Sequence, residues 1–180
     1  MGIVAYKAFK KGLIATRGNG VYQYKEGVNE FPKAKCVSEG AHCAEDPLDV
    51  FNYYSPGNDT EYRIVIASGD IDESEGDSKI ACTRLIIKRE LSLKELLCAA
   101  LLFWKKHPER SRSDYSISGF FKMIADSNPI LKGKKGEILC FARKKGKIID
   151  KINIFEIDGA DFKPDIYYNI SGKEANQSEQ

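Results

Sequence analysis

Several features that would narrow the function at once are missing from this 180-residue sequence. It contains no run of about 18 apolar residues, which speaks against a membrane-spanning helix. The segment Met1–Tyr6 lacks a basic stretch followed by an apolar block, so no signal peptide is expected. The five cysteines show no paired Cys-x-x-Cys spacing. These absences predict a cytoplasmic protein with free thiols and no membrane partner.

Signatures of metal sites and of nucleophilic catalysis are equally scarce. The candidate metal ligands are one histidine and three cysteines: Cys36, His42, Cys43 and Cys82. Their spacing matches no zinc motif. A thiol nucleophile would have to combine Cys43 or Cys98 with His42 or His107, again without support from spacing. We therefore expect no metal site, and an enzyme is the less favoured interpretation.

No segment matches the full sequence pattern of a calcium-binding or phosphate-binding loop. A calcium loop starting at Asp70 needs Gly at its sixth position and Glu at its twelfth, where Glu75 and Ala81 stand. The glycine-containing segments 18–20 and 133–136 lack the pattern of a phosphate-binding loop. No cofactor is therefore expected from these segments, and the acidic run around Asp70 is interpreted as a solvated hairpin loop.

Charge is distributed in blocks, although the net charge is only +2. Two clusters are candidate binding surfaces for a charged macromolecule. The acidic cluster consists of Asp70, Asp72, Glu73, Glu75 and Asp77. The basic cluster consists of Lys132, Lys134, Lys135, Arg143, Lys144, Lys145 and Lys147. The alternative is that both are solvated hairpins whose charges neutralise one another across the fold.

Local patterns predict strands and helices in the first part of the chain. A strand is expected over Ile3–Phe9, and a helix over Pro47–Tyr54, where proline and acidic residues suit a helix start. Glu61–Ser68 and Lys79–Lys88 are expected to pair as a long hairpin. Ser92 and Glu95 form a capping box that opens a helix ending at Trp104 or Lys105, before His107-Pro108.

The rest of the chain is expected to be mainly β. A short helix is considered around Phe120–Ala125, followed by β segments over 137–143, 148–157 and 162–168. The predicted domains are an α+β domain (1–108), a linker or short helical insert (109–131), a C-terminal β segment (132–170) and a disordered tail (171–180). The predicted fold class is α+β: a mostly antiparallel sheet with two or three helices and a small C-terminal β segment.

One segment runs from Gly40-Ala41-His42-Cys43 through Pro47-Leu48-Asp49. It resembles the hallmark of an uncharacterised family of phage and prophage proteins. The strand Ala5–Phe9, the Arg89–Leu93 helix start and the Lys163-Pro164-Asp165 segment also match that family. Ala41 replaces the family's usual Phe, and its Ser-, Ala- and Gly-rich repeats are absent. The resemblance implies a location in the cytoplasm of a bacterial host, without implying an activity.

A more distant resemblance concerns enzymes that use NAD. The order of strand, Gly-x-His loop, tyrosine-bearing helix and strand is similar to the NAD-binding half of ADP-ribosyltransferase-like folds. This resemblance would place Tyr6, His42, Tyr53 and Tyr54 around the nicotinamide ring. Those enzymes have His or Arg on the first strand and Glu late in the sheet, whereas the first strand here has Tyr6 and Lys7.

Three functions follow from these observations. The leading interpretation is a phage or prophage accessory protein that binds a host protein or ribonucleoprotein stoichiometrically, as an inhibitor of host defence of the anti-CRISPR type. Nucleic acid is a possible partner through the basic cluster. The first alternative is an ADP-ribosyltransferase-like NAD-binding enzyme, and the second is a virion-associated structural module.

Overall fold

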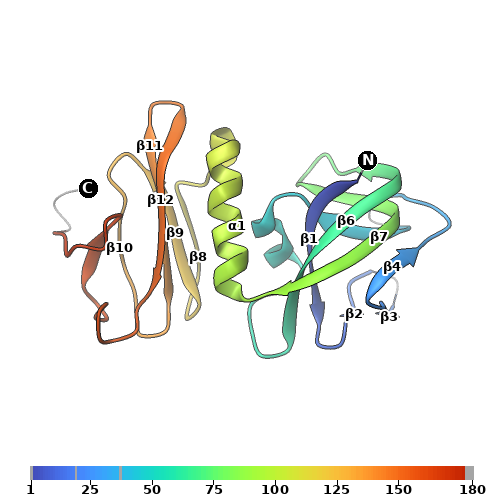
Figure 1. Cartoon of the computed structure of the whole chain (residues 1–180), viewed down its shortest axis with the longest axis horizontal. Coiled ribbons are helices and arrows are strands. Elements are labelled where there is room, and N and C mark those ends of the chain that lie inside the picture. Colours follow the sequence, from blue (N-terminus) through green and yellow to red (C-terminus); the bar gives the residue numbers. More distant parts are fainter. Residues whose placement is uncertain (1, 19, 37, 177–180) are drawn as a thin grey trace. The chain divides into compact units, whose positions relative to one another are not determined.

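The computed structural model describes residues 2–18, 20–36 and 38–176. The chain divides into two compact units, Met1–Leu96 and Leu97–Gln180, hereafter the first and second units. Strands predominate in both (Figure 1). The coarse expectation of a mostly antiparallel α+β protein is confirmed. The expected two or three helices are too many, because the described residues form one α-helix and two short 3-10 helices.

Strands of the first unit close on themselves. They are β1 (Ile3–Lys10), β2 (Ile14–Ala15), β3 (Tyr22–Gln23), β4 (Gly27–Glu30), β5 (Ala41–Ala44), β6 (Thr60–Glu73) and β7 (Lys79–Leu91). β6 pairs with β1 and with β7, and β5 also pairs with β7. A single pair, Tyr6 with Ala44, joins β5 to β1. The strands β1, β6, β7 and β5 therefore form a closed ring in which each is paired on both edges.

The predicted hairpin is confirmed and is longer than expected. β6 and β7 extend to Glu73 and from Lys79, which leaves only residues 74–78 as the turn. The pairing register shifts between Arg63 and Val65. Because each residue of shift exchanges the two faces of a strand, Val65 and Ala67 fill the core, whereas the neighbouring isoleucines stay half-exposed.

The core of the first unit lies between these strands. It is built from buried residues on the same face of each strand: Ala5, Phe9, Ala41, Cys43, Val65, Ala67, Ile80, Cys82, Leu85 and Ile87. Alternation along β1 places Lys7 on this face, between Ala5 and Phe9. The core face of β1 thus carries a lysine at its centre.

The Pro-Leu-Asp segment forms the 3-10 helix η1 (Pro47–Asn52), a shorter helix than expected. The Asp46 side chain caps it by accepting from the Leu48 N–H at 2.9 Å. Buried Asp49 accepts from both the N–H and the hydroxyl of Ser78, at 3.0 and 2.8 Å. The Ser78 hydroxyl oxygen also accepts from the Asp46 N–H. These bonds fasten η1 to the start of β7, so the acidic residues of this segment are structural.

The helix α1 (Leu93–Lys106) begins at the predicted capping box. Glu95 accepts from the Ser92 N–H at 2.8 Å, and Ser92 accepts from the Glu95 N–H at 3.2 Å. Its buried residues repeat at the predicted helical spacing: Leu96, Leu97, Ala100, Leu101 and Trp104. No helix in the described part of the chain is long and apolar enough to cross a membrane.

The second unit contains a four-stranded sheet in the order β12-β11-β9-β8. Its elements are the 3-10 helix η2 (Pro108–Arg110), β8 (Asp114–Ile117), β9 (Phe121–Asp126), β10 (Ile130–Lys132), β11 (Ile138–Lys145), β12 (Ile148–Glu156) and β13 (Tyr167–Asn169). β9 and β11 pair in parallel, and β10 pairs with β13 in a separate ribbon. Segments 109–131 and 132–170 therefore contribute strands to one sheet.

Three expectations for this unit are wrong. The β segment expected over 162–168 is a strand only from Tyr167, where β13 begins. The short helix considered around Phe120–Ala125 is strand β9, because Phe121, Met123 and Ala125 are buried with a period of two. The expected disordered tail is paired as far as Ala175: Glu174 bridges to Tyr168, and the Ala175 N–H donates to the Tyr167 carbonyl. Tail residues 177–180 lie outside the described residues.

Candidate functional site: an aromatic and cationic pocket

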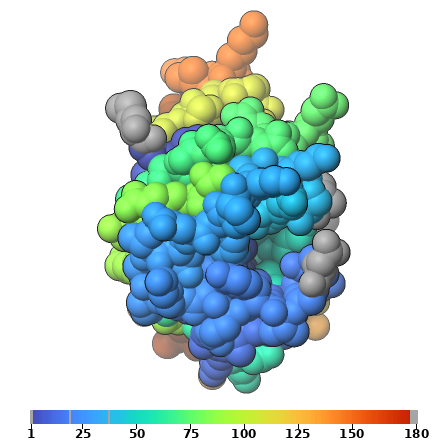
Figure 2. Space-filling model, turned by 90° about the vertical axis from the view of Figure 1, so that its right-hand side faces the viewer, coloured from blue at the N-terminus to red at the C-terminus, as the bar shows by residue number. Residues whose placement is uncertain are grey.

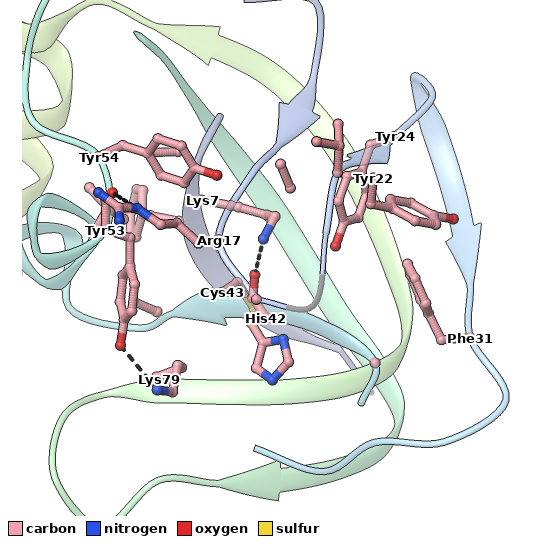
Figure 3. Close-up of a pocket in the computed structure, with 18 of the residues that line it drawn as sticks. Lys7, Arg17, Tyr22, Tyr24, Phe31, His42, Cys43, Tyr53, Tyr54 and Lys79 are labelled. Atoms are coloured by element: carbon pink, nitrogen blue, oxygen red, sulfur yellow. Dashed lines mark hydrogen bonds between the residues drawn. The ribbon is translucent and has the colours of Figure 1, made fainter. Parts of the chain in front are cut away.

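A cavity of about 370 Å³ opens in the first unit. It is lined by residues of β1 and β5, by η1 and the chain after it, by the chain from β2 to just beyond β4, and by the start of β7. Figure 2 shows the surface hollowed beside the blue segments near the start of the chain. In the close-up, Lys7 and His42 lie between an aromatic end, with Tyr22 and Phe31, and a polar end (Figure 3).

The aromatic end is formed by Tyr22, Tyr24 and Phe31. The Tyr22 and Tyr24 ring centroids are 4.7 Å apart, and Tyr22 and Phe31 are 5.3 Å apart. Tyr24 is buried and contacts Phe9 of the core at 5.3 Å, whereas Tyr22 is 45% exposed. Burial raises the pKa of the Tyr24 hydroxyl, which therefore stays neutral. This end offers neutral aromatic faces and edges to a ligand ring.

The polar end is formed by Arg17, Tyr53, Tyr54 and Lys79. The Arg17 Nε donates to the Tyr53 carbonyl at 3.0 Å, and the Tyr54 hydroxyl accepts from the Thr16 N–H at 2.7 Å. These two bonds hold the segment after β2 against the chain after η1. The Lys79 Nζ donates to the Tyr53 hydroxyl at 3.1 Å.

Asp77 supports Tyr53 from the turn between β6 and β7. The Tyr53 hydroxyl donates to its carboxylate at 2.7 Å. Burial alone raises the pKa of Asp77, but hydrogen bonds from Tyr53 and from the Lys79 N–H outweigh it and lower that pKa. Burial likewise lowers the pKa of Lys79, while its bond to Tyr53 and the nearby charges raise it overall. Asp77 and Lys79 thus stay ionised at neutral pH, and both are bonded to the Tyr53 hydroxyl, whose raised pKa keeps it neutral.

Lys7 lies at the centre of the pocket. Its Nζ donates to the His42 carbonyl at 2.6 Å and lies 5.2 and 5.1 Å from the ring centroids of Phe9 and Tyr24. Burial lowers the pKa of Lys7 to about 8, against the opposing effect of the Cys43 and Cys82 thiols. No carboxylate lies within ion-pair distance of Lys7 among the described residues. The sequence analysis noted Lys7 on the first strand but gave it no role, although a lysine between Ala5 and Phe9 on an alternating strand was a usable signal.

The Gly40-Ala41-His42-Cys43 segment forms the approach to the pocket and strand β5. Gly40 has φ +89°, and a Cβ there would lie 2.8 Å from the Lys33 carbonyl oxygen, so only glycine fits. Burial lowers the pKa of His42, and the Lys7 charge lowers it further. At neutral pH the imidazole that lines the pocket is therefore mostly uncharged.

Cys43 and Cys82 form a thiol pair beside Lys7. Cys43 donates to the Cys82 sulfur, and this bond together with burial raises the pKa of Cys43 well above its usual range. The same bond lowers the pKa of Cys82 despite its burial. Within the described residues, the cysteines and His42 do not gather into a group of metal ligands.

The charged side chains that line the described part of the pocket are all cationic. Its cationic residues are Lys7, Arg17 and Lys79, and no aspartate or glutamate occurs among the described lining residues. The four residues that the NAD-enzyme interpretation singled out, Tyr6, His42, Tyr53 and Tyr54, all line this one cavity. The aromatic end was not anticipated by the sequence analysis.

The two predicted charged clusters lie in different units. Asp70, Asp72 and Glu73 end β6, with Glu75 and Asp77 in the turn that follows. Asp72 accepts from the Cys36 N–H at 2.6 Å, and Asp77 serves Tyr53, so these two carboxylates have internal partners. The acidic cluster is therefore less available for a binding partner than its sequence indicated.

The basic cluster belongs to the second unit. Its residues fall on β10 (Lys132), the following turn (Lys134, Lys135), β11 (Arg143, Lys144, Lys145) and the β11–β12 turn (Lys147). Arg143 is paired with Asp150 through two hydrogen bonds of 2.9 and 2.7 Å. The Lys132 Nζ lies 4.7 Å from the centre of the Tyr167 ring. Lys145 and Lys147 are exposed at the tip of the hairpin.

Comparison with known proteins gives a family for the first unit and the start of α1. Searches of curated proteins and of solved structures found no match. The model of one family, described as a domain of unknown function (DUF7666), matches residues 3–99. This match spans more than half of the 180 residues, including every described residue that lines the pocket. The chain therefore belongs to the DUF7666 family.

Proposed function

We propose that the DUF7666 domain of this chain binds a small anionic ligand that carries an aromatic ring, of the nucleotide class. The observation that carries the proposal is the composition of the pocket: aromatic rings at one end, three cationic side chains, and no carboxylate among its described lining residues. Ligand pockets of about 300–1,000 Å³ typically combine apolar walls with a few polar groups that fix orientation. This cavity, of about 370 Å³, falls in that range.

The two ends of the pocket favour one orientation of such a ligand. A base or nicotinamide ring suits Tyr22 and Phe31, whose rings are tilted by 47° and leave edges and faces for contact. Phosphate groups suit Arg17 and Lys79, because charge-assisted hydrogen bonds to phosphate are stronger than neutral ones. Lys7 then lies between the ring and the phosphates.

A dinucleotide such as NAD is the first ligand to test, because Tyr6, His42, Tyr53 and Tyr54 converge on the cavity. ADP-ribosyl transfer is less well supported. The resemblance that suggested it also calls for a glutamate, and no described lining residue supplies a carboxylate. The proposal is accordingly binding of the nucleotide rather than its cleavage.

Isothermal titration of the full chain with NAD and with AMP tests the proposal. We expect saturable heat from at least one of them, and about a tenfold loss of affinity in Arg17→Ala, equivalent to one charged contact of about 1.4 kcal/mol. Arg84→Ala is the matched control, because Arg84 is an exposed arginine of the same unit that does not line the pocket. The proposal is wrong if neither compound binds to the folded wild-type protein.

We propose a second function for the other unit: stoichiometric binding of a host macromolecule by a phage or prophage accessory protein, as an anti-defence factor. The supporting observation is the exposed hairpin tip with Lys145 and Lys147, next to Ile148, which is 58% exposed. Exposed lysines beside an apolar side chain suit nucleic acid or a ribonucleoprotein.

A pull-down from bacterial lysate, with and without nuclease, tests this second function. The wild-type chain should recover a defined partner, and Lys145→Glu combined with Lys147→Glu should lose it. A control variant that reverses the charge of Lys94 and Lys105, two exposed lysines of α1, should still recover the partner. Recovery of no host protein or nucleic acid by the wild-type chain would count against this function.

A further inference from the structure

Lys7 occupies a position where a lysine is costly. It shares the inward face of β1 with Ala5 and Phe9, which have no solvent exposure. A charged group on a core face normally has an oppositely charged partner. Here the partners of its ammonium are the His42 carbonyl and two aromatic faces, with no carboxylate at ion-pair distance among the described residues.

The amine is nevertheless within reach of a ligand. Lys7 lines the cavity and keeps partial exposure, whereas its neighbours Ala5 and Phe9 have none. Figure 3 shows its side chain extending into the space between the aromatic end and Arg17. A ligand whose ring contacts Tyr22 and whose phosphate contacts Arg17 would therefore pass beside the Lys7 Nζ.

This environment favours the reactive form of the amine. The neutral amine, and not the ammonium, is the nucleophile, and buried lysines that lack an acidic partner serve in Schiff bases. Burial lowers the pKa of Lys7 to about 8. The titratable groups that face its Nζ are His42 and Cys43 on β5, Cys82 on β7 and Tyr24 after β3. None of these groups is a carboxylate, and Cys82 is the one thiol among them with a lowered pKa.

We propose that Lys7 captures an anionic aromatic aldehyde as a Schiff base inside the pocket. The lone pair of the Lys7 nitrogen attacks the carbonyl carbon, and the carbonyl oxygen takes up a proton to give a carbinolamine. Loss of that oxygen as water leaves a carbon–nitrogen double bond. One amine and one aldehyde thus give one imine and one water, without oxidant or reductant. The inference builds on the proposed anionic aromatic ligand and adds a carbonyl group to it.

The pocket sets the class of aldehyde. Arg17 and Lys79 favour a phosphate on the ligand, and Tyr22 and Phe31 favour a ring. A phosphorylated aromatic aldehyde therefore reacts at Lys7 in preference to a short aliphatic one of the same intrinsic reactivity.

Pyridoxal 5′-phosphate is a suitable probe, since it combines ring, phosphate and aldehyde. The full chain is incubated with a substoichiometric amount and reduced with borohydride, which turns the imine into a stable secondary amine. Peptide mass spectrometry then locates the adduct. We expect it on Lys7, with about a tenfold rise in labelling from about pH 7 to about pH 9 as the amine with a pKa of about 8 loses its proton. Hexanal should label Lys7 less.

Lys7→Arg keeps the charge and removes the nucleophile, and Lys11→Arg is the control at an exposed lysine that follows the same strand. The first should abolish the adduct and the second should not. Labelling spread over exposed lysines while Lys7 stays unmodified in the folded wild-type protein overturns the inference, whether or not either variant folds. NAD or AMP binding without Lys7 labelling refutes the Schiff base at Lys7 but leaves the proposed nucleotide binding intact. Lys7 labelling without nucleotide binding refutes only the proposed nucleotide binding.

Discussion

The two units place their polar groups in opposite ways. In the first unit, Lys7 and two cysteines lie on the inner face of the strand ring, and an aromatic cavity opens beside them. In the second, the core contains stacked rings: Phe155 lies 5.1 Å from Phe141 and 4.1 Å from Phe162. The lysines of that unit are mostly on its surface. Groups that can do chemistry are therefore concentrated in the unit that belongs to the DUF7666 family.

The largest expected effect tests whether the units are independent. Phe141→Ala removes a fully buried ring from the second unit and should cost about 4 kcal/mol of its unfolding free energy. Ligand binding in the first unit should survive. Denaturant titration followed by calorimetry at low denaturant measures both. Ile148→Ala, at an exposed position, is the control and should change stability by less than about 0.5 kcal/mol. Parallel loss of binding would show that the units unfold together.

The next effect concerns the attachment of η1 in the first unit. Asp49→Ala leaves the Ser78 N–H without its partner and removes two hydrogen bonds to a buried carboxylate, so it should cost about 3 kcal/mol. Thermal unfolding measures it. Asp59→Ala, an exposed aspartate paired with Lys10, should cost at most about 1 kcal/mol. Equal losses in the two variants would mean that the Asp49 network contributes little.

An effect of similar size separates backbone strain from close approach. Gly40→Ala suffers from both a positive φ and a carbonyl 2.8 Å from its new Cβ, and should cost about 3 kcal/mol. Gly12→Ala has a similar φ of +79° and empty space, and should cost only about 1 kcal/mol. Thermal unfolding of both proteins gives the difference. If the two costs agree, the contact with the Lys33 carbonyl relaxes without penalty.

The smallest effect is the pH dependence of the cap of α1. Hydrogen bonds from the Ser92 N–H, from Arg89 and from the Ser92 hydroxyl lower the pKa of Glu95 to about 2. An unfolded glutamate titrates near pH 4.3, so this cap stabilises the protein above about pH 4.3 and is lost as the pH falls towards about 2. Because Glu95 is exposed, the change is small. In acid titrations followed by circular dichroism, Glu95→Gln should make the stability depend less on pH over that interval. A pH profile identical to that of the wild-type protein would contradict this.

Local signals account for what the sequence predicted correctly. The β6–β7 hairpin follows from alternation on both sides of an acidic turn, and α1 follows from the Ser92–Glu95 box and helical spacing. Both depend on residues close in sequence. The parallel pairing of β9 with β11 joins segments without a hairpin, and nothing local in Phe121–Asp126 indicates its partner. The helix considered there was wrong because the period of two in Phe121, Met123 and Ala125 was not weighed against it.

The candidate site likewise contains residues that the sequence predicted and residues that it missed. Tyr6, His42, Tyr53 and Tyr54 were proposed together from a resemblance, and they do line one cavity. The aromatic end was missed because it depends on β2, β3 and β4, strands of two to four residues whose positions are set by distant pairing. Lys7 was named only as a departure from the ADP-ribosyltransferase-like pattern, and the alternation that places it between Ala5 and Phe9 on one face of β1 was not used.

The pairing of β1 has a consequence for synthesis on the ribosome. Ile3 pairs with Ala67, so the partner of the first strand emerges 64 residues later (67 minus 3). Until then an apolar strand with Val4, Ala5 and Phe9 is exposed beside the nascent chain, where unpaired strands aggregate. A charge within such a segment acts as a gatekeeper against aggregation. We therefore expect Lys7 to protect the nascent chain before the pocket forms, and its replacement by an apolar residue to lower soluble yield even where the mature fold tolerates the change.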